Sequence, residues 1–92
     1  MDVQHDEAGR RFFIALPDGS EAQLLYKREG EALNFFRTYV PEASREKGLA
    51  KKIVEAGFRY AQAHHLKVIP TCSYVAVTFL SRHPEFQPLV HP

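Results

Sequence analysis

At residues 38–50 the chain reads Thr38-Tyr39-Val40-Pro41-Glu42-Ala43-Ser44-Arg45-Glu46-Lys47-Gly48-Leu49-Ala50, and this stretch joins two segments of different periodicity. The segment before it, residues 32–40, carries apolar side chains on both faces: Leu33, Phe35 and Tyr39 on one, Phe36 and Val40 on the other. The segment after it, residues 49–64, carries a broad apolar stripe at helical spacing. We therefore predict that the stretch connects a central strand, covered on both faces, to a long helix.

The other apolar segments predict an α/β fold with a mixed sheet. Residues 11–16 and 21–27 read as strands, residues 66–70 as a short buried parallel strand, and residues 73–82 as a second helix that begins after an N-cap at Ser73. The predicted order is strand–strand–strand–helix–strand–helix. The third strand, the long helix and the fourth strand then form a right-handed βαβ unit. We expect a flexible lead over residues 1–9 and a single domain over residues 10–92.

Gly57 lies in the middle of the apolar stripe of the expected long helix. A glycine there costs about 1 kcal/mol relative to alanine. We interpret it as a sign that the helix approaches the sheet closely at this position.

Composition excludes several classes of protein. The 92 residues include 12 Lys+Arg and 11 Asp+Glu, so the formal charge is +1, and acids and bases alternate along the chain, which argues against a nucleic-acid partner. No segment approaches the roughly 20 apolar residues of a membrane span. The first residues are acidic rather than signal-like, and Cys72 is the only cysteine. We therefore expect a cytoplasmic protein without disulfides and without a metal site.

The predicted strand-to-helix connection has the features of an anion site. The first backbone N–H groups of a helix lack partners within the helix and lie at the positive end of its dipole. Gly48 and Ala50 would let a phosphate approach the backbone, and Arg45 and Lys47 add positive charge. A competing, structural interpretation is that Gly48 only relaxes a turn. The local pattern by itself favours the structural interpretation.

Three segments together resemble a small single-domain subfamily of the GNAT N-acetyltransferases. Residues 45–50 are similar to the family's acetyl-CoA signature, Arg/Gln-x-x-Gly-x-Gly/Ala, and stand as there between a strand and a helix. The other two segments are Ile69-Pro70-Thr71-Cys72-Ser73-Tyr74-Val75 and Phe79-Leu80-x-Arg82-His83-Pro84. The resemblance covers nearly the whole chain. It implies a truncated GNAT fold, with a βαβ unit around the acetyl-CoA loop and without the N-terminal helices of larger members.

By position, the resemblance implies a site for acetyl-CoA. The cofactor-binding residues it implies are Tyr39, Val40, Arg45, Glu46, Lys47, Gly48, Leu49 and Ala50. In this view the loop N–H groups bind the pyrophosphate, and the strand edge at Tyr39 and Val40 binds the pantetheine arm. The sequence departs from the family pattern at Glu46, where many members have glycine, and at Arg37, where relatives often have a histidine that could act as a base.

Cys72 and Tyr74 are the candidate catalytic residues. Larger GNATs often protonate the departing thiolate with a tyrosine on the closing helix, whereas the corresponding stretch here, residues 78–80, carries no phenol. Cys72 precedes the second helix, and a helix N-terminus lowers the pKa of a thiol. Cys72 could therefore protonate the leaving sulfur or accept an acetyl group. The alternative is that Cys72 is a small buried apolar residue, as unpaired cysteines usually are.

These observations predict an acetyl-CoA-dependent N-acetyltransferase in which a bound amine attacks directly. The acceptor is left open among a lysine side chain, a protein N-terminus and a small amine. The alternative is a non-catalytic module that binds CoA or acyl-CoA, or that interacts with another protein. A generic anion-binding α/β domain would follow if the resemblance were due to chance.

Overall fold

Five strands form one sheet in the order β1-β2-β3-β4-β5. The computed structural model describes residues 2–91, apart from the side chain of Glu46. The elements are β1 (Gln4–Asp6), β2 (Arg11–Ala15), β3 (Glu21–Glu29), β4 (Ala32–Tyr39), the 3₁₀ helix η1 (Glu42–Lys47), α1 (Leu49–Ala63), β5 (Lys67–Ile69), the π-helical segment η2 (Tyr74–Phe79), α2 (Leu80–Arg82) and the 3₁₀ helix η3 (Pro84–Leu89).

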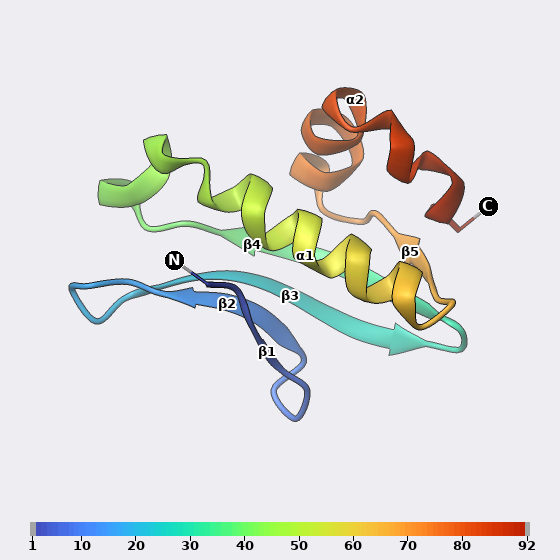
Figure 1. Cartoon of the computed structure of the whole chain (residues 1–92), viewed down its shortest axis with the longest axis horizontal. Helices are drawn as coiled ribbons and strands as arrows, with labels where there is room; N and C mark the ends of the chain where they lie inside the picture. The colour runs from blue at the N-terminus through green and yellow to red at the C-terminus, as the bar shows by residue number, and fades with distance from the viewer. Residues whose placement is uncertain (1, 92) are drawn as a thin grey trace.

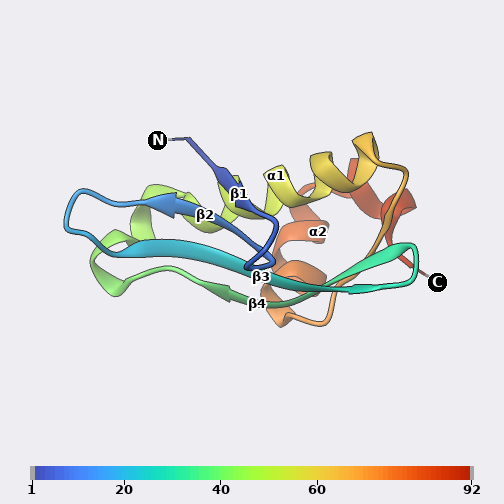
Figure 2. The ribbon, with the colours of Figure 1, turned by 90° about the horizontal axis from the view of Figure 1, so that it is seen from below.

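The sheet is mixed, as the sequence predicts. Strands β1 to β4 pair antiparallel, and β4 pairs with β5 in parallel. Helix α1 connects these two parallel strands, which confirms the predicted βαβ unit. It runs along the sheet, and the C-terminal helical segments lie beside it near β5 (Figures 1 and 2). No helix of the described residues is long and apolar enough to cross a membrane.

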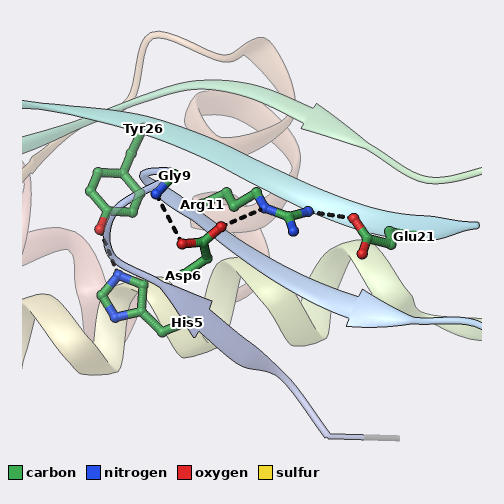
Figure 3. Close-up of polar contacts among 6 residues, drawn as sticks. All are labelled: His5, Asp6, Gly9, Arg11, Glu21 and Tyr26. Atoms are coloured by element: carbon green, nitrogen blue, oxygen red, sulfur yellow. Dashed lines mark hydrogen bonds and ion pairs between the residues drawn. The ribbon is translucent and has the colours of Figure 1, made fainter.

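The N-terminal residues differ from the expected flexible lead, because Gln4–Asp6 pair with β2. The His5 ring stacks on Phe12, with 4.1 Å between ring centroids, and meets Tyr60 edge-on at 4.5 Å. Its Nε2 also shares a hydrogen bond of 2.5 Å with the Tyr26 hydroxyl (Figure 3). These contacts join residues far apart in the sequence, so the polar composition of residues 1–9 gave no sign of them.

A register shift in β4 corrects the predicted faces of the central strand. Tyr26 pairs with Phe35, but Leu25 pairs with Arg37, so Phe36 is an extra residue in β4. Such a bulge reverses the alternation that follows it. Phe35 is therefore buried, whereas Phe36 and Tyr39 are each 42% exposed. The prediction that Tyr39 shares a face with Phe35, and that both faces of the whole strand are covered, was wrong.

The packing of α1 confirms the interpretation of Gly57. A Cβ atom at this position would lie 2.9 Å from Leu24 Cδ2 and 2.9 Å from Phe35 Cζ. Both of these side chains are fully buried in the sheet below. Helix and sheet can therefore approach this closely only because residue 57 has no side chain.

The second helix forms, but with π-helical geometry. The N–H of Leu80 donates to the carbonyl of Val75, five residues earlier, which is the π-helical spacing. This spacing buries Val75, Phe79 and Leu80 and leaves Val77 68% exposed. Ser73 is the N-cap residue of η2, as the sequence predicts, but it makes no side-chain cap hydrogen bond.

Candidate functional site

The bend between η1 and α1 presents the first backbone N–H groups of α1, which have no partner within the helix. Gly48 has φ 69° and ψ 23°, a left-handed conformation, and precedes α1 as its N-cap without a side-chain hydrogen bond. The first bond of the helix runs from the Lys52 N–H to the Gly48 carbonyl. A left-handed residue after a right-handed one also turns successive N–H groups toward a common point, which suits an anion. The structure therefore has a left-handed glycine bend at the position where the sequence predicts an anion site.

Two cations lie on the same bend. Arg45 and Lys47 are exposed on η1, and together with Glu42 and Ala43 they line a hollow of about 670 Å³. The Arg45 Nε donates a 3.0 Å hydrogen bond to the Val40 carbonyl. This bond fixes the guanidinium near the end of β4 through Nε and leaves its terminal nitrogens available. The side chain of Glu46 lies outside the described residues.

Gly48 is required for its conformation, and the space beside it is open. A Cβ atom there would meet nothing within 4 Å, although the positive φ disfavours any residue with a side chain. The structure therefore supports the expected turn and also leaves room for a ligand against the backbone.

Strands β4 and β5 pair only over the first residues of β4. Their parallel pairing ends at Asn34 and Ile69, while β4 continues to Tyr39. Beyond this point the Cys72 N–H donates to the Phe35 carbonyl at 2.9 Å. We call the region between the C-terminal half of β4 and the start of η2, where β4 is no longer paired with β5, the wedge. Val40 lies at its end toward η1.

Cys72 and Thr38 face each other across this wedge. The Cys72 Sγ–H donates to Thr38 Oγ1 at 3.5 Å. Partial burial raises the pKa of the thiol, but hydrogen bonds from the Thr38 hydroxyl and from the backbone N–H groups of Val75 and Tyr74 outweigh it. The pKa of Cys72 thus lies below its ordinary value, in the direction expected for a thiol at the start of a helix.

Tyr74 lies close to Cys72, and its phenol stays protonated at neutral pH. Burial raises the pKa of Tyr74, and the neighbouring Cys72 adds to this, while Arg82 acts in the opposite direction. The structure brings both predicted catalytic side chains to the start of η2, beside β4. A protonated phenol and a weakly acidic thiol are both able to donate a proton there.

Thr38 is the residue of this site that sequence reasoning missed. The bulge places Thr38 opposite the buried Leu24, so that it faces the core side of the sheet and Cys72. Regular alternation of side chains along the strand would have placed Thr38 on the face opposite Phe35. The one available signal was the break in apolar alternation at Phe35-Phe36, which indicates a bulge as well as a doubly covered strand.

Fold and bend together define a βαβ domain whose crossover helix α1 begins after a left-handed glycine flanked by basic residues. A family model described as GCN5-related N-acetyl-transferase matches residues 11–89. Protein NATD1 of Danio rerio is 36% identical over 90 residues, which cover 95% of this chain and 80% of that protein. Protein NATD1 of Gallus gallus is 31% identical over 93 residues, which cover 99% of this chain and 84% of that protein. The chain belongs to the GCN5-related N-acetyltransferase family.

A solved structure shares the fold. It is the NMR solution structure of a GCN5-like putative N-acetyltransferase from Staphylococcus aureus, which matches with a TM-score of 0.74. The match covers 98% of this chain and 87% of that chain, at 23% sequence identity. The GNAT-like mixed α/β fold inferred from the sequence is therefore confirmed.

Proposed function

We propose that the protein is an acetyl-CoA-dependent N-acetyltransferase that moves an acetyl group to an amine by direct attack of that amine. The observation that carries the proposal is the uncapped bend at Gly48 next to the wedge between β4 and η2. Family membership supports the N-acetyltransferase class. We further propose a cytoplasmic location, where the single thiol of Cys72 would stay reduced.

The residues of the bend fit the phosphates of acetyl-CoA. The N–H groups of Gly48, Leu49 and Ala50 would hold the pyrophosphate, with Arg45 and Lys47 beside it. The edge of β4 at Tyr39 and Val40 would hold the pantetheine arm through backbone hydrogen bonds. Acetyl-CoA supplies an activated thioester, and the chain supplies position and protons.

Three groups in the wedge would assist the transfer. The Val40 N–H would polarise the acetyl carbonyl, as oxyanion donors do in acyl transfer. Cys72 Sγ, with its proton shared with Thr38, would donate that proton to the departing sulfur. The Tyr74 hydroxyl, two residues further along the chain, is the second proton donor. Among the described residues, no histidine or carboxylate is one of the groups that shift the pKa of the Cys72 thiol, and the amine would lose its proton to solvent.

That absence of a base near Cys72 favours, as a second candidate, a module that binds CoA or acyl-CoA without efficient turnover. Both candidates use the same bend and predict the same binding of acetyl-CoA. They differ only in whether an amine is consumed.

Release of free CoA distinguishes the two. The purified chain is incubated with acetyl-CoA and with lysine peptides, free N-terminal peptides and small amines in turn, and free thiol is recorded over time. We expect release that depends on one class of amine and that Lys47→Gln reduces by raising the KM for acetyl-CoA. Binding of acetyl-CoA without amine-dependent release from any class would establish the module instead.

A further inference from the structure

A second hollow lies on the face of the sheet opposite the buried core. It has a volume of about 230 Å³ and is lined by Gln23, Leu25, Arg37 and Tyr39. The register places Gln23 opposite Tyr39 and Leu25 opposite Arg37, and directly opposed residues of a sheet share a face. All four side chains therefore project from β3 and β4 to the same side. The intervening Leu24 is fully buried on the other side.

The charge of Arg37 is not balanced by the part of the chain that the structure describes. Arg11, on the same face of the sheet, is held between Asp6, at 3.2 Å, and Glu21 (Figure 3). Arg37 has no hydrogen bond or ion pair with any described residue, and none of the residues lining its hollow carries a carboxylate. One guanidinium on this face is thus neutralised by the protein, and the other is left for a ligand.

The polar groups of this hollow are suited to donate hydrogen bonds. The Arg37 guanidinium, the Gln23 amide and the Tyr39 hydroxyl all carry donors, and the guanidinium offers a planar fork that matches a carboxylate. Leu25 supplies an apolar floor. This combination favours a carboxylate over a cation or a neutral amine.

The hollow is next to the wedge proposed for acetyl transfer. Arg37 and Tyr39 flank Thr38 in the chain, and the Thr38 side chain projects to the other face and meets Cys72. The backbone of β4 therefore lies between the hollow at Arg37 and the wedge at Thr38. Because β5 pairs with β4 no further than Asn34, the edge of β4 at residues 37–39 is not covered by β5. A molecule anchored at Arg37 could therefore extend around this edge.

We propose that the Gln23–Arg37–Tyr39 hollow binds the carboxylate of the acceptor, and that the acceptor is a small amine that also carries a carboxylate. The proposal rests on the proposed acetyltransferase function. The volume of the hollow, about 230 Å³, lies below the roughly 300–1,000 Å³ of sites for drug-sized ligands. It suits one carboxylate and a short carbon chain. A carboxylate held here would direct the amine of the same molecule toward the wedge.

A binding experiment tests the hollow without requiring turnover. The ¹⁵N-labelled chain is titrated with 4-aminobutyrate and, separately, with 4-aminobutanamide, which has the same amine and length but no charge on its other end. We expect amide shifts at Gln23, Leu25, Arg37 and Tyr39 with the carboxylate only. Arg37→Gln should abolish them, and Lys27→Gln, a charge removed from β3 outside the hollow, should not. Equal responses to both compounds, or none to either, would overturn the proposal.

A kinetic experiment tests the acceptor class. CoA release is measured with a panel of amino acids, each paired with its carboxamide. We expect a KM about tenfold lower for the acids, as for a hydrogen-bonded charge, a preference lost in Arg37→Gln and partly restored in Arg37→Lys. Equal KM values for acids and carboxamides, or better turnover of a protein lysine, would overturn the proposal. Failure of every amine to release CoA would instead contradict the proposed enzyme, and the binding experiment would still decide whether the hollow takes a carboxylate.

Discussion

Gly48 combines a conformational requirement with a place in the anion site, and the two can be separated by mutation. In Gly48→Ala the positive φ costs about 1–2 kcal/mol of stability, and the added methyl group occupies the open space beside the backbone. We expect this variant to bind acetyl-CoA at least tenfold more weakly, at roughly 1.4 kcal/mol per factor of ten. Calorimetric titration measures the affinity, and urea unfolding measures the stability.

Gly30 provides the matched control for this variant. It has φ 62° and nothing within 4 Å of a would-be Cβ, but it lies in the turn between β3 and β4. Gly30→Ala should lose similar stability and keep full affinity. If both variants lose affinity equally, strain rather than contact explains the effect, and Gly48 has no direct role in binding.

Cys72 is predicted to act as a proton donor, which fixes the sign of its pH dependence. The thiol must be protonated to donate, so kcat should fall as the pH rises through the lowered pKa of Cys72. The acceptor amine must be neutral, so the rate should rise with pH at the lower end, which gives a bell-shaped profile. We expect Cys72→Ala to lower kcat by about 10²-fold and to remove the descending limb. An unchanged kcat–pH profile in Cys72→Ala would exclude Cys72 from the mechanism and leave Tyr74 as the donor.

At the scale of elements, α1 depends on the missing side chain of Gly57. Alanine there gains about 1 kcal/mol of helix propensity but forces a methyl group against Leu24 and Phe35, and overpacking costs about 1–3 kcal/mol. The net effect expected for Gly57→Ala in urea unfolding is a destabilisation of up to about 2 kcal/mol. A combined Gly57→Ala, Leu24→Ala variant should lose less than the sum of its two single changes, since removal of the leucine opens the space. Full additivity would contradict close contact as the cause.

The elements that the sequence predicted well are those with long, regular patterns. The 15 residues of α1 carry one apolar stripe. The bend at Gly48 combines a glycine, basic residues and a change from strand to helix periodicity. The bulge at Phe36 could not be predicted, because two adjacent phenylalanines fit a doubly covered strand equally well. In the π-helical segment η2, Phe79 stacks on Phe58 with 5.3 Å between ring centroids, a contact between distant residues that the local sequence does not reveal. The site residue that depends on the bulge, Thr38, was missed for the same reason.

At the scale of the whole molecule, β1 connects the N-terminus to both sheet and helix through His5. Burial lowers the pKa of His5 below its ordinary value of 6.5, although Glu7 and Asp6 act to raise it, and His64 lowers it further. The unfolded chain therefore takes up a proton at His5 before the folded chain does. The stabilising contribution of neutral His5 is complete above pH 6.5 and is lost as the pH falls through 6.5 toward the lowered value.

Two substitutions test this linkage. His5→Phe keeps a ring against Phe12 but cannot be protonated, so the loss of stability between pH 7.5 and pH 5.5 should be smaller than in the unmodified chain. His65→Asn is the control, because His65 is exposed and its φ of 57° is tolerated by asparagine. Urea unfolding at the two pH values measures both. The account of β1 fails if His5→Phe and His65→Asn change the pH dependence equally.

The most direct test of the whole account is an amide titration of the ¹⁵N-labelled chain with acetyl-CoA. We predict saturable shifts that are largest at residues 46–50, with smaller ones at Tyr39, Val40 and Cys72. Inert amides at residues 46–50, or shifts confined to another part of the surface, would contradict the claim that the N–H groups at the start of α1 bind the donor.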